Sequence, residues 1–151
     1  MHKAIVFVVL MAAAACGGSG STGSASPSPS VPAATVAAAH NATLGTILVD
    51  GNGRTLYLFE ADKGTSSTCY GSCATYWPPL MTGGAPQAGA GATASLLGTT
   101  KRTDGTTEVT YAGHPLYYVV TDHNPGDATG QGVNNFGAVW DVVGPDGNKI
   151  G

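Results

Sequence analysis

The sequence is poor in charge of either sign, and poorest in positive charge. Only 10% of its 151 residues are charged, with six Lys or Arg against nine Asp or Glu. It contains no basic stripe of the kind that marks a nucleic-acid-binding surface, and no polybasic cluster that would attract anionic lipid headgroups. We therefore expect no nucleic-acid partner, and any membrane attachment must have another cause.

A long hydrophobic run is also lacking. The longest run covers residues 4–15 (AIVFVVLMAAAA), whereas a membrane-spanning helix needs about 20 apolar residues. Lys3 precedes the run and small residues end it, which is the pattern of a secretory signal. The sequence therefore predicts a signal peptide at residues 1–15 and an extracytoplasmic location.

Cysteine is scarce, and the three that are present fall into two groups. Cys16 follows three alanines at the end of the apolar run, a pattern that resembles the bacterial lipobox, whose cysteine is lipidated and becomes the first residue after cleavage. We expect lipid on Cys16, palmitate included, to hold the chain on a bacterial membrane. Cys69 and Cys73 remain, and in an exported protein they are expected to form a disulfide.

Large apolar residues are missing from the stretch that follows Cys16. Residues 16–40 consist mainly of Gly, Ser, Pro and Ala, a composition that favours a flexible tether over a packed core. The predicted folded domain is residues 41–151, which is the size of one ordinary domain.

Amphipathic helical patterns are absent from this domain, whereas strand and turn signals recur. Residues 44–49 and 55–60 flank a Gly- and Asn-rich turn, and residues 97–102 and 106–111 flank Asp104-Gly105, so each pair predicts a β-hairpin. Further strands are expected at residues 115–121 and 138–143, with one helical turn within residues 71–76. The predicted fold is mainly β and antiparallel, built of hairpins.

The domain contains an internal repeat, at about residues 44–81 and 97–143. Aligning Tyr57 with Tyr117 also brings Asp62 to the position of Asp122. Each half also has a Leu-Gly-Thr triplet near its start and a tryptophan near its end, Trp77 in the first and Trp140 in the second. These features occur in the same order in both halves. Two half-domains with one plan are expected to pack together and share a core.

These residues also carry a family resemblance. Tyr57, Phe59 and Asp62 match the repeated Tyr-x-(Phe/Trp/Tyr)-x-x-Asp motif of a family of bacterial secreted lipoproteins. Tyr117 and Asp122 match it again, with Val119 in place of the aromatic residue. The resemblance implies an envelope lipoprotein with two short β repeats. It implies no catalytic residues, because the family is one of unknown function.

The candidate chemistry has alternatives at each position. The Cys69/Cys73 pair could be a redox-active disulfide or a soft-metal site instead of a structural one, although its spacing matches no thioredoxin-like or haem-attachment motif. Asp62 and Asp122 are expected to cap turns, since a structural device recurs with a repeat.

One group of polar residues could form ordinary turns or, alternatively, a metal or haem site. It consists of imidazole and carboxylate side chains, which suit transition metals: His114, Asp122, His123 and Asp127.

Catalytic motifs are also lacking. No Gly-x-Ser-x-Gly nucleophile and no Gly-rich phosphate loop is present, and the tyrosines and tryptophans are expected in the core and not in a sugar-stacking groove. The sequence therefore predicts a non-catalytic binding or interaction module without a cofactor, anchored in the envelope, with an unknown partner there. The alternative is a redox or metal/haem-handling lipoprotein that transfers electrons.

Overall fold

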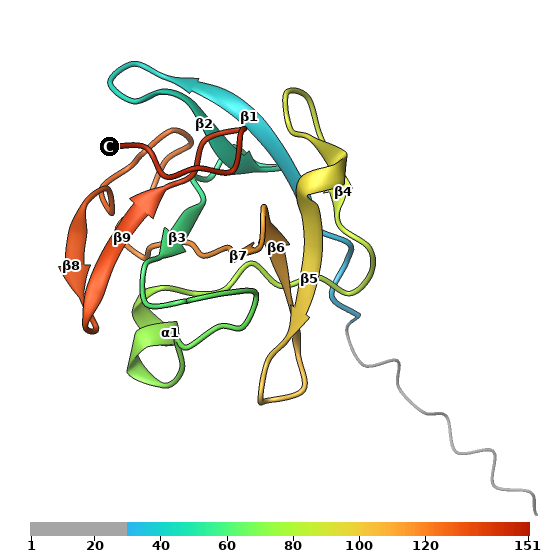
Figure 1. Ribbon diagram of the computed structural model, residues 1–151. Coiled ribbons are helices and arrows are strands. Elements are labelled where there is room, and N and C mark those ends of the chain that lie inside the picture. Colours follow the sequence, from blue (N-terminus) through green and yellow to red (C-terminus); the bar gives the residue numbers. More distant parts are fainter. Residues whose placement is uncertain (1–29) are drawn as a thin grey trace, which may run out of the picture.

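The computed structural model describes residues 30–151 (Figure 1). The predicted signal peptide and Cys16 lie outside these residues. No helix in the described part is long and apolar enough to cross a membrane. Its elements, in chain order, are β1 (Thr35–Asn41), β2 (Gly45–Asp50), β3 (Tyr57–Phe59), α1 (Ser72–Tyr76), β4 (Gln87–Ala88), η1 (Ala94–Leu96), β5 (Leu97–Lys101), β6 (Thr107–Tyr111), β7 (His114–Pro115), β8 (Val133–Asn135) and β9 (Ala138–Val142).

The strands form three small sheets, which confirms the mainly β fold class. Their orders are β2-β1-β4, β3-β9-β8 and β5-β6-β7. All pairings are antiparallel except the short parallel contact between β1 and β4. Figure 1 shows the sheets wrapped around a common interior, with α1 at one side of the domain.

The two repeats meet through a set of reciprocal backbone hydrogen bonds. Tyr57 and Tyr117 each donate their N–H to the other's carbonyl, at 2.9 Å in both directions. The N–H groups of Leu80 and Val143 bond to the carbonyls of Leu116 and Leu56, at 2.8 and 3.2 Å. Since each bond of one repeat has its counterpart in the other, the repeats are related by an approximate two-fold exchange centred on the two tyrosines.

The core belongs to both repeats. One buried cluster contains Tyr57 and Trp77 of the first repeat together with Tyr117 and Trp140 of the second. A second cluster likewise mixes Leu48 and other residues of the first repeat with residues of the second. Neither repeat has an apolar interior of its own, as the shared plan of the halves predicts.

The domain starts earlier than the predicted boundary at Asn41. Thr35–Asn41 form β1, which pairs along its length with β2. The sequence does not reveal this strand, because its alanines resemble those of a flexible tether. In the structure these alanines are needed for close packing. A Cβ atom on Gly89 would lie 2.8 Å from the Ala37 Cβ, and one on Gly91 would lie 2.8 Å from the Ala38 Cβ. Small residues on both segments therefore let the β4 region lie against β1.

The first predicted hairpin is present but shorter than expected. Asp50 N–H bonds to the Arg54 carbonyl and Leu56 N–H to the Leu48 carbonyl, at 2.9 and 3.0 Å, around a bridge between Val49 and Thr55. β3 then turns away to pair with β9. Both faces of β3 are buried, and its two edges pair with β9 and, at Tyr57, with Tyr117 of the second repeat.

The hairpin at residues 97–111 is confirmed, with β5 and β6 in register from Leu97↔Tyr111 to Lys101↔Thr107. The strand expected at residues 115–121 is reduced to the short β7 and isolated bridges at Tyr117, because this segment contacts several different strands in turn. The last strand and the helical turn are confirmed as β9 and α1.

Candidate functional site

The motif tyrosine of each repeat donates a hydrogen bond to the motif aspartate of the other repeat. The Tyr57 hydroxyl donates to Asp122 Oδ2 and the Tyr117 hydroxyl to Asp62 Oδ2, both at 2.6 Å. Burial raises the pKa of each tyrosine, and the adjacent carboxylates raise it further. Both hydroxyls therefore keep their protons and act as donors.

The second oxygen of each carboxylate caps its own loop, as predicted. Asp62 Oδ1 accepts from the N–H and the hydroxyl of Thr68, both at 2.7 Å. Asp122 Oδ1 accepts from the same two groups of Thr129, at 2.9 and 2.7 Å. Neither threonine was predicted, although a threonine six or seven residues after each motif aspartate is a readable signal.

The aromatic residues of the motif and its repeat stack at the centre. The Trp77 and Trp140 rings are parallel with centroids 4.0 Å apart, and Phe59 stacks on Trp140 at 4.0 Å. Tyr57 and Tyr117 meet the two tryptophans edge-on, at 5.3 and 5.1 Å. Val119 occupies the place of the second motif aromatic and is buried in the same cluster. These rings form the core, and among them Phe59 also lines the open groove described below.

Cys69 and Cys73 form the expected disulfide, with Cα atoms 5.3 Å apart. The loop that it closes contains the start of α1, and Trp77 N–H caps that helix at the Cys73 carbonyl. Cys69 is fully buried and Cys73 is 7% exposed. The bond therefore lies beneath the surface, where it fixes the position of Trp77.

A buried ion pair holds the disulfide loop against the second repeat. Arg102 Nη1 donates to Glu108 Oε2 at 2.6 Å and to Ser67 Oγ at 2.8 Å, and Nη2 donates to the Cys69 carbonyl at 2.6 Å. Both side chains of the pair are almost completely buried, and Glu108 Oε1 has no hydrogen-bond partner. Burial raises the pKa of Glu108 to about 7, although Arg102 opposes the shift. No sequence pattern predicts this pair.

The candidate metal ligands serve other purposes in the structure. Asp127 Oδ2 accepts from the backbone N–H groups of His123 and Asn124, at 2.9 and 2.8 Å, so this segment is a turn. Asp122 is occupied by Tyr57 and Thr129. Within residues 30–151 no group of three or more potential metal-ligating side chains occurs. His114 lies on β7, in a separate groove.

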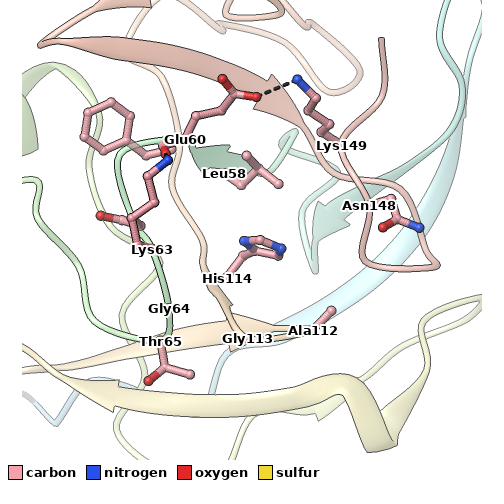
Figure 2. A pocket seen from close by; sticks show the side chains of 12 residues that line it. Leu58, Glu60, Lys63, Gly64, Thr65, Ala112, Gly113, His114, Asn148 and Lys149 are labelled. Atoms are coloured by element: carbon pink, nitrogen blue, oxygen red, sulfur yellow. Dashed lines mark hydrogen bonds and ion pairs between the residues drawn. The ribbon is translucent and has the colours of Figure 1, made fainter.

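This groove, of about 650 Å³, lies between the loop after β3, the β6–β7 turn and the C-terminal segment (Figure 2). Lys149 Nζ lies 2.5 Å from Glu60 Oε1 at its rim, and Lys63 donates to the Glu60 carbonyl at 2.7 Å. In Figure 2 the imidazole of His114 lies between Lys63 on one side and Asn148 on the other. The groove thus presents donors, acceptors and charges of both signs around a partly apolar floor that includes Leu58 and Phe59.

Comparison with known proteins matches both repeats to one family. The family model described as "Secreted repeat of unknown function" matches residues 38–81 and 98–144. No significant match was found among curated proteins or among solved structures. The two matched segments are the halves that exchange the Tyr–Asp hydrogen bonds, and the first begins within β1.

Proposed function

The chain belongs to this family of secreted repeats of unknown function, and we propose that it is a lipid-anchored, non-catalytic binding module of a bacterial cell envelope. Its extracytoplasmic location follows from the family. The lipid on Cys16, the binding role and the absence of catalysis are the proposed parts.

The binding role is supported by a difference between two sets of polar side chains, those of the motif and those of the groove. The motif hydroxyls and carboxylates satisfy one another inside the domain. The polar groups of the groove, in contrast, face solvent around an open space. Ligand pockets combine such an apolar floor with a few polar groups that fix orientation. We therefore assign the motif to the scaffold and ligand binding to the groove.

The anchor is tested in cells. Wild-type chain is expected to incorporate labelled palmitate and to fractionate with membranes, and the Cys16→Ser variant to lose the label. A mature wild-type protein with an unmodified Cys16, shown by intact mass, would refute the anchor.

The groove is tested by site-specific photo-crosslinking in the producing cell. A crosslinking residue at Thr65, which is exposed in the groove, is expected to capture an envelope component, and the same residue at Thr103, exposed in the β5–β6 turn outside the groove, is the matched control. His114→Ala with Lys149→Ala should abolish capture at Thr65. Equal capture at both positions, or capture that survives the double substitution, would refute the assignment.

A further inference from the structure

Three of the four large hydrophobic residues exposed in the described part of the chain lie together. Tyr76 at the end of α1 is 37% exposed, and Val120 and Phe136 are each 44% exposed. The Tyr76 and Phe136 rings are 6.4 Å apart, and Val120 N–H bonds to the Tyr76 carbonyl at 3.1 Å. We call these three residues the apolar patch. The fourth residue, Val31, lies near Met81 and Thr82.

The segments that carry the patch are themselves uncharged. Residues 72–77, 119–121 and 133–138 contain no Asp, Glu, Lys, Arg or His, although Asp122 and His123 directly follow the second segment. Burying the three patch side chains in an apolar medium therefore strands no ionised group on these segments.

The backbone conformation at Phe136 is unfavourable for a phenylalanine. Phe136 and Gly137 form the two-residue turn between β8 and β9, with φ angles of +53° and +95°. Such turns favour Asn or Gly at the first position, because the left-handed region is strained for a residue with a bulky side chain. A large aromatic residue is thus held at an exposed turn tip against the local preference, which is typical of a functional position.

We propose that the apolar patch is a docking surface for the lipid bilayer that holds the chain. Part of this inference rests on the proposed anchor at Cys16. A stable protein interface buries about 800 Å² per partner, which is more than three partly exposed side chains supply. A bilayer needs no matching shape, and aromatic residues favour its interface. The lack of basic residues points to insertion of apolar side chains and not to attraction by anionic headgroups.

The length of chain before the domain permits this contact. Ser30 comes fourteen residues after Cys16, and a segment of that length reaches about 46 to 50 Å when extended. A domain of this size is about 35 Å across. Figure 1 shows α1 and the β8–β9 turn on the side of the domain away from the start of the described chain, and the extended segment is longer than the domain is across.

The test is amide hydrogen exchange of the lipidated chain on vesicles of phosphatidylethanolamine and phosphatidylglycerol. Residues 72–77 are the reporter, before and after the domain is released by a protease site introduced within residues 20–26. We expect exchange there to be several-fold slower while the domain is held on the vesicles. Val120→Asn with Phe136→Asn should remove this difference, whereas Val31→Asn, an exposed hydrophobic residue outside the patch, should leave it.

A second arm separates docking from anchoring. Released domain, which no longer contains Cys16, is expected to show partial protection of residues 72–77 when it is mixed with the same vesicles at millimolar lipid. Equal exchange in every state of the wild type would overturn the docking proposal and leave the anchor intact. Protection that rises with protein concentration without vesicles would identify a second copy as the occupant and would also overturn it.

Discussion

At the scale of single residues, the two Tyr–Asp hydrogen bonds are alike in length but different in surroundings. Both tyrosines are fully buried, but the Tyr117 hydroxyl donates to Asp62 and accepts from the Ser67 hydroxyl, and Asp62 is itself only 6% exposed. Asp122 is partly open to solvent, so water can replace a lost partner there. The second-repeat hydroxyl should therefore matter more to stability than the first.

This difference predicts unequal effects of removing one oxygen atom. Tyr117→Phe should lower the free energy of unfolding by about 2 kcal/mol, because it strands the buried Asp62 oxygen. Tyr57→Phe should lower it by about 1 kcal/mol, because Asp122 can be hydrated and the bond from Gly130 N–H to the Tyr57 hydroxyl is long, at 3.3 Å. Urea denaturation of both variants measures the two losses. A larger loss for Tyr57→Phe would contradict the assignment of Asp62 as the less hydrated carboxylate.

The buried Glu108 makes stability depend on pH. Its pKa is raised to about 7 by burial, so its ionisation is less favourable in the folded chain than in the unfolded one. The stabilisation from the neutral carboxyl is complete below pH 4.5 and is lost as the pH rises through 7, by at most about 3 kcal/mol. Glu108→Gln should flatten this decline. Unfolding curves of both proteins from about pH 4 to 8 test it, and a wild type that gains stability over that range relative to the variant would show that Arg102 dominates.

At the scale of elements, the disulfide loop is a local constraint with a definite size. Closing a loop of this length stabilises the fold by about 2 kcal/mol in the chain-entropy model. Cys69→Ala with Cys73→Ala should lose about that amount, and α1, only five residues long, should exchange its amide hydrogens first. Because the sulfurs are covered, we also expect mild reductant to leave the native disulfide intact, as intact mass would show. Rapid reduction without unfolding would instead favour the redox alternative.

The β8–β9 turn offers a substitution that should stabilise the domain. Phe136→Asn places a residue that tolerates positive φ where the backbone requires it, and we expect a gain of about 0.5 to 1 kcal/mol in the free energy of unfolding. Thermal unfolding measures it, and Gly137→Ala, with φ of +95°, should be destabilising in the same assay. A loss on Phe136→Asn would mean that the contact between Phe136 and Tyr76 outweighs the strain.

The elements that the sequence revealed are those with local causes. Asp104-Gly105 at the β5–β6 turn and the alternation around it are readable within a short stretch of chain, and that hairpin is as predicted. The pairing of β3 with β9 joins residues more than 80 positions apart, so no local pattern specifies it. β1 was not predicted because its alanines resemble a linker. Their role becomes clear only in the structure, where Gly89 and Gly91 pack closely against them.

The candidate site divides in the same way. The motif itself, the disulfide and the turn-capping role of Asp62 and Asp122 were predictable because they recur or follow from residue type. The exchange of hydrogen bonds between repeats was not, since the alignment shows only that Tyr57 corresponds to Tyr117 and not which aspartate each contacts. The ion pair of Arg102 was also unpredictable, because its partner carboxylate occupies an inward position on β6 where the pattern favours an apolar residue.

At the scale of the whole molecule, the exchange makes the repeats interdependent. Each motif tyrosine finds its carboxylate in the other half, each half contributes to both core clusters, and β3 has its strand partner in the second repeat. A half-domain alone would expose one face of every shared cluster and leave a buried carboxylate without its donor, costs that exceed the stability of a domain of this size.

We therefore predict that the two repeats fold together or not at all. Residues 30–91 and residues 92–151, produced separately, should each give the circular dichroism and amide chemical shifts of an unfolded chain, because neither can cover its own tryptophan. Mixed together, they should regain the native spectrum only to the extent that they associate, and Tyr57→Phe with Tyr117→Phe should weaken that association. A half that folds cooperatively on its own would contradict this prediction. The reciprocal hydrogen bonds would then join two independently folded units, and the motif would connect two domains instead of stabilising a single one.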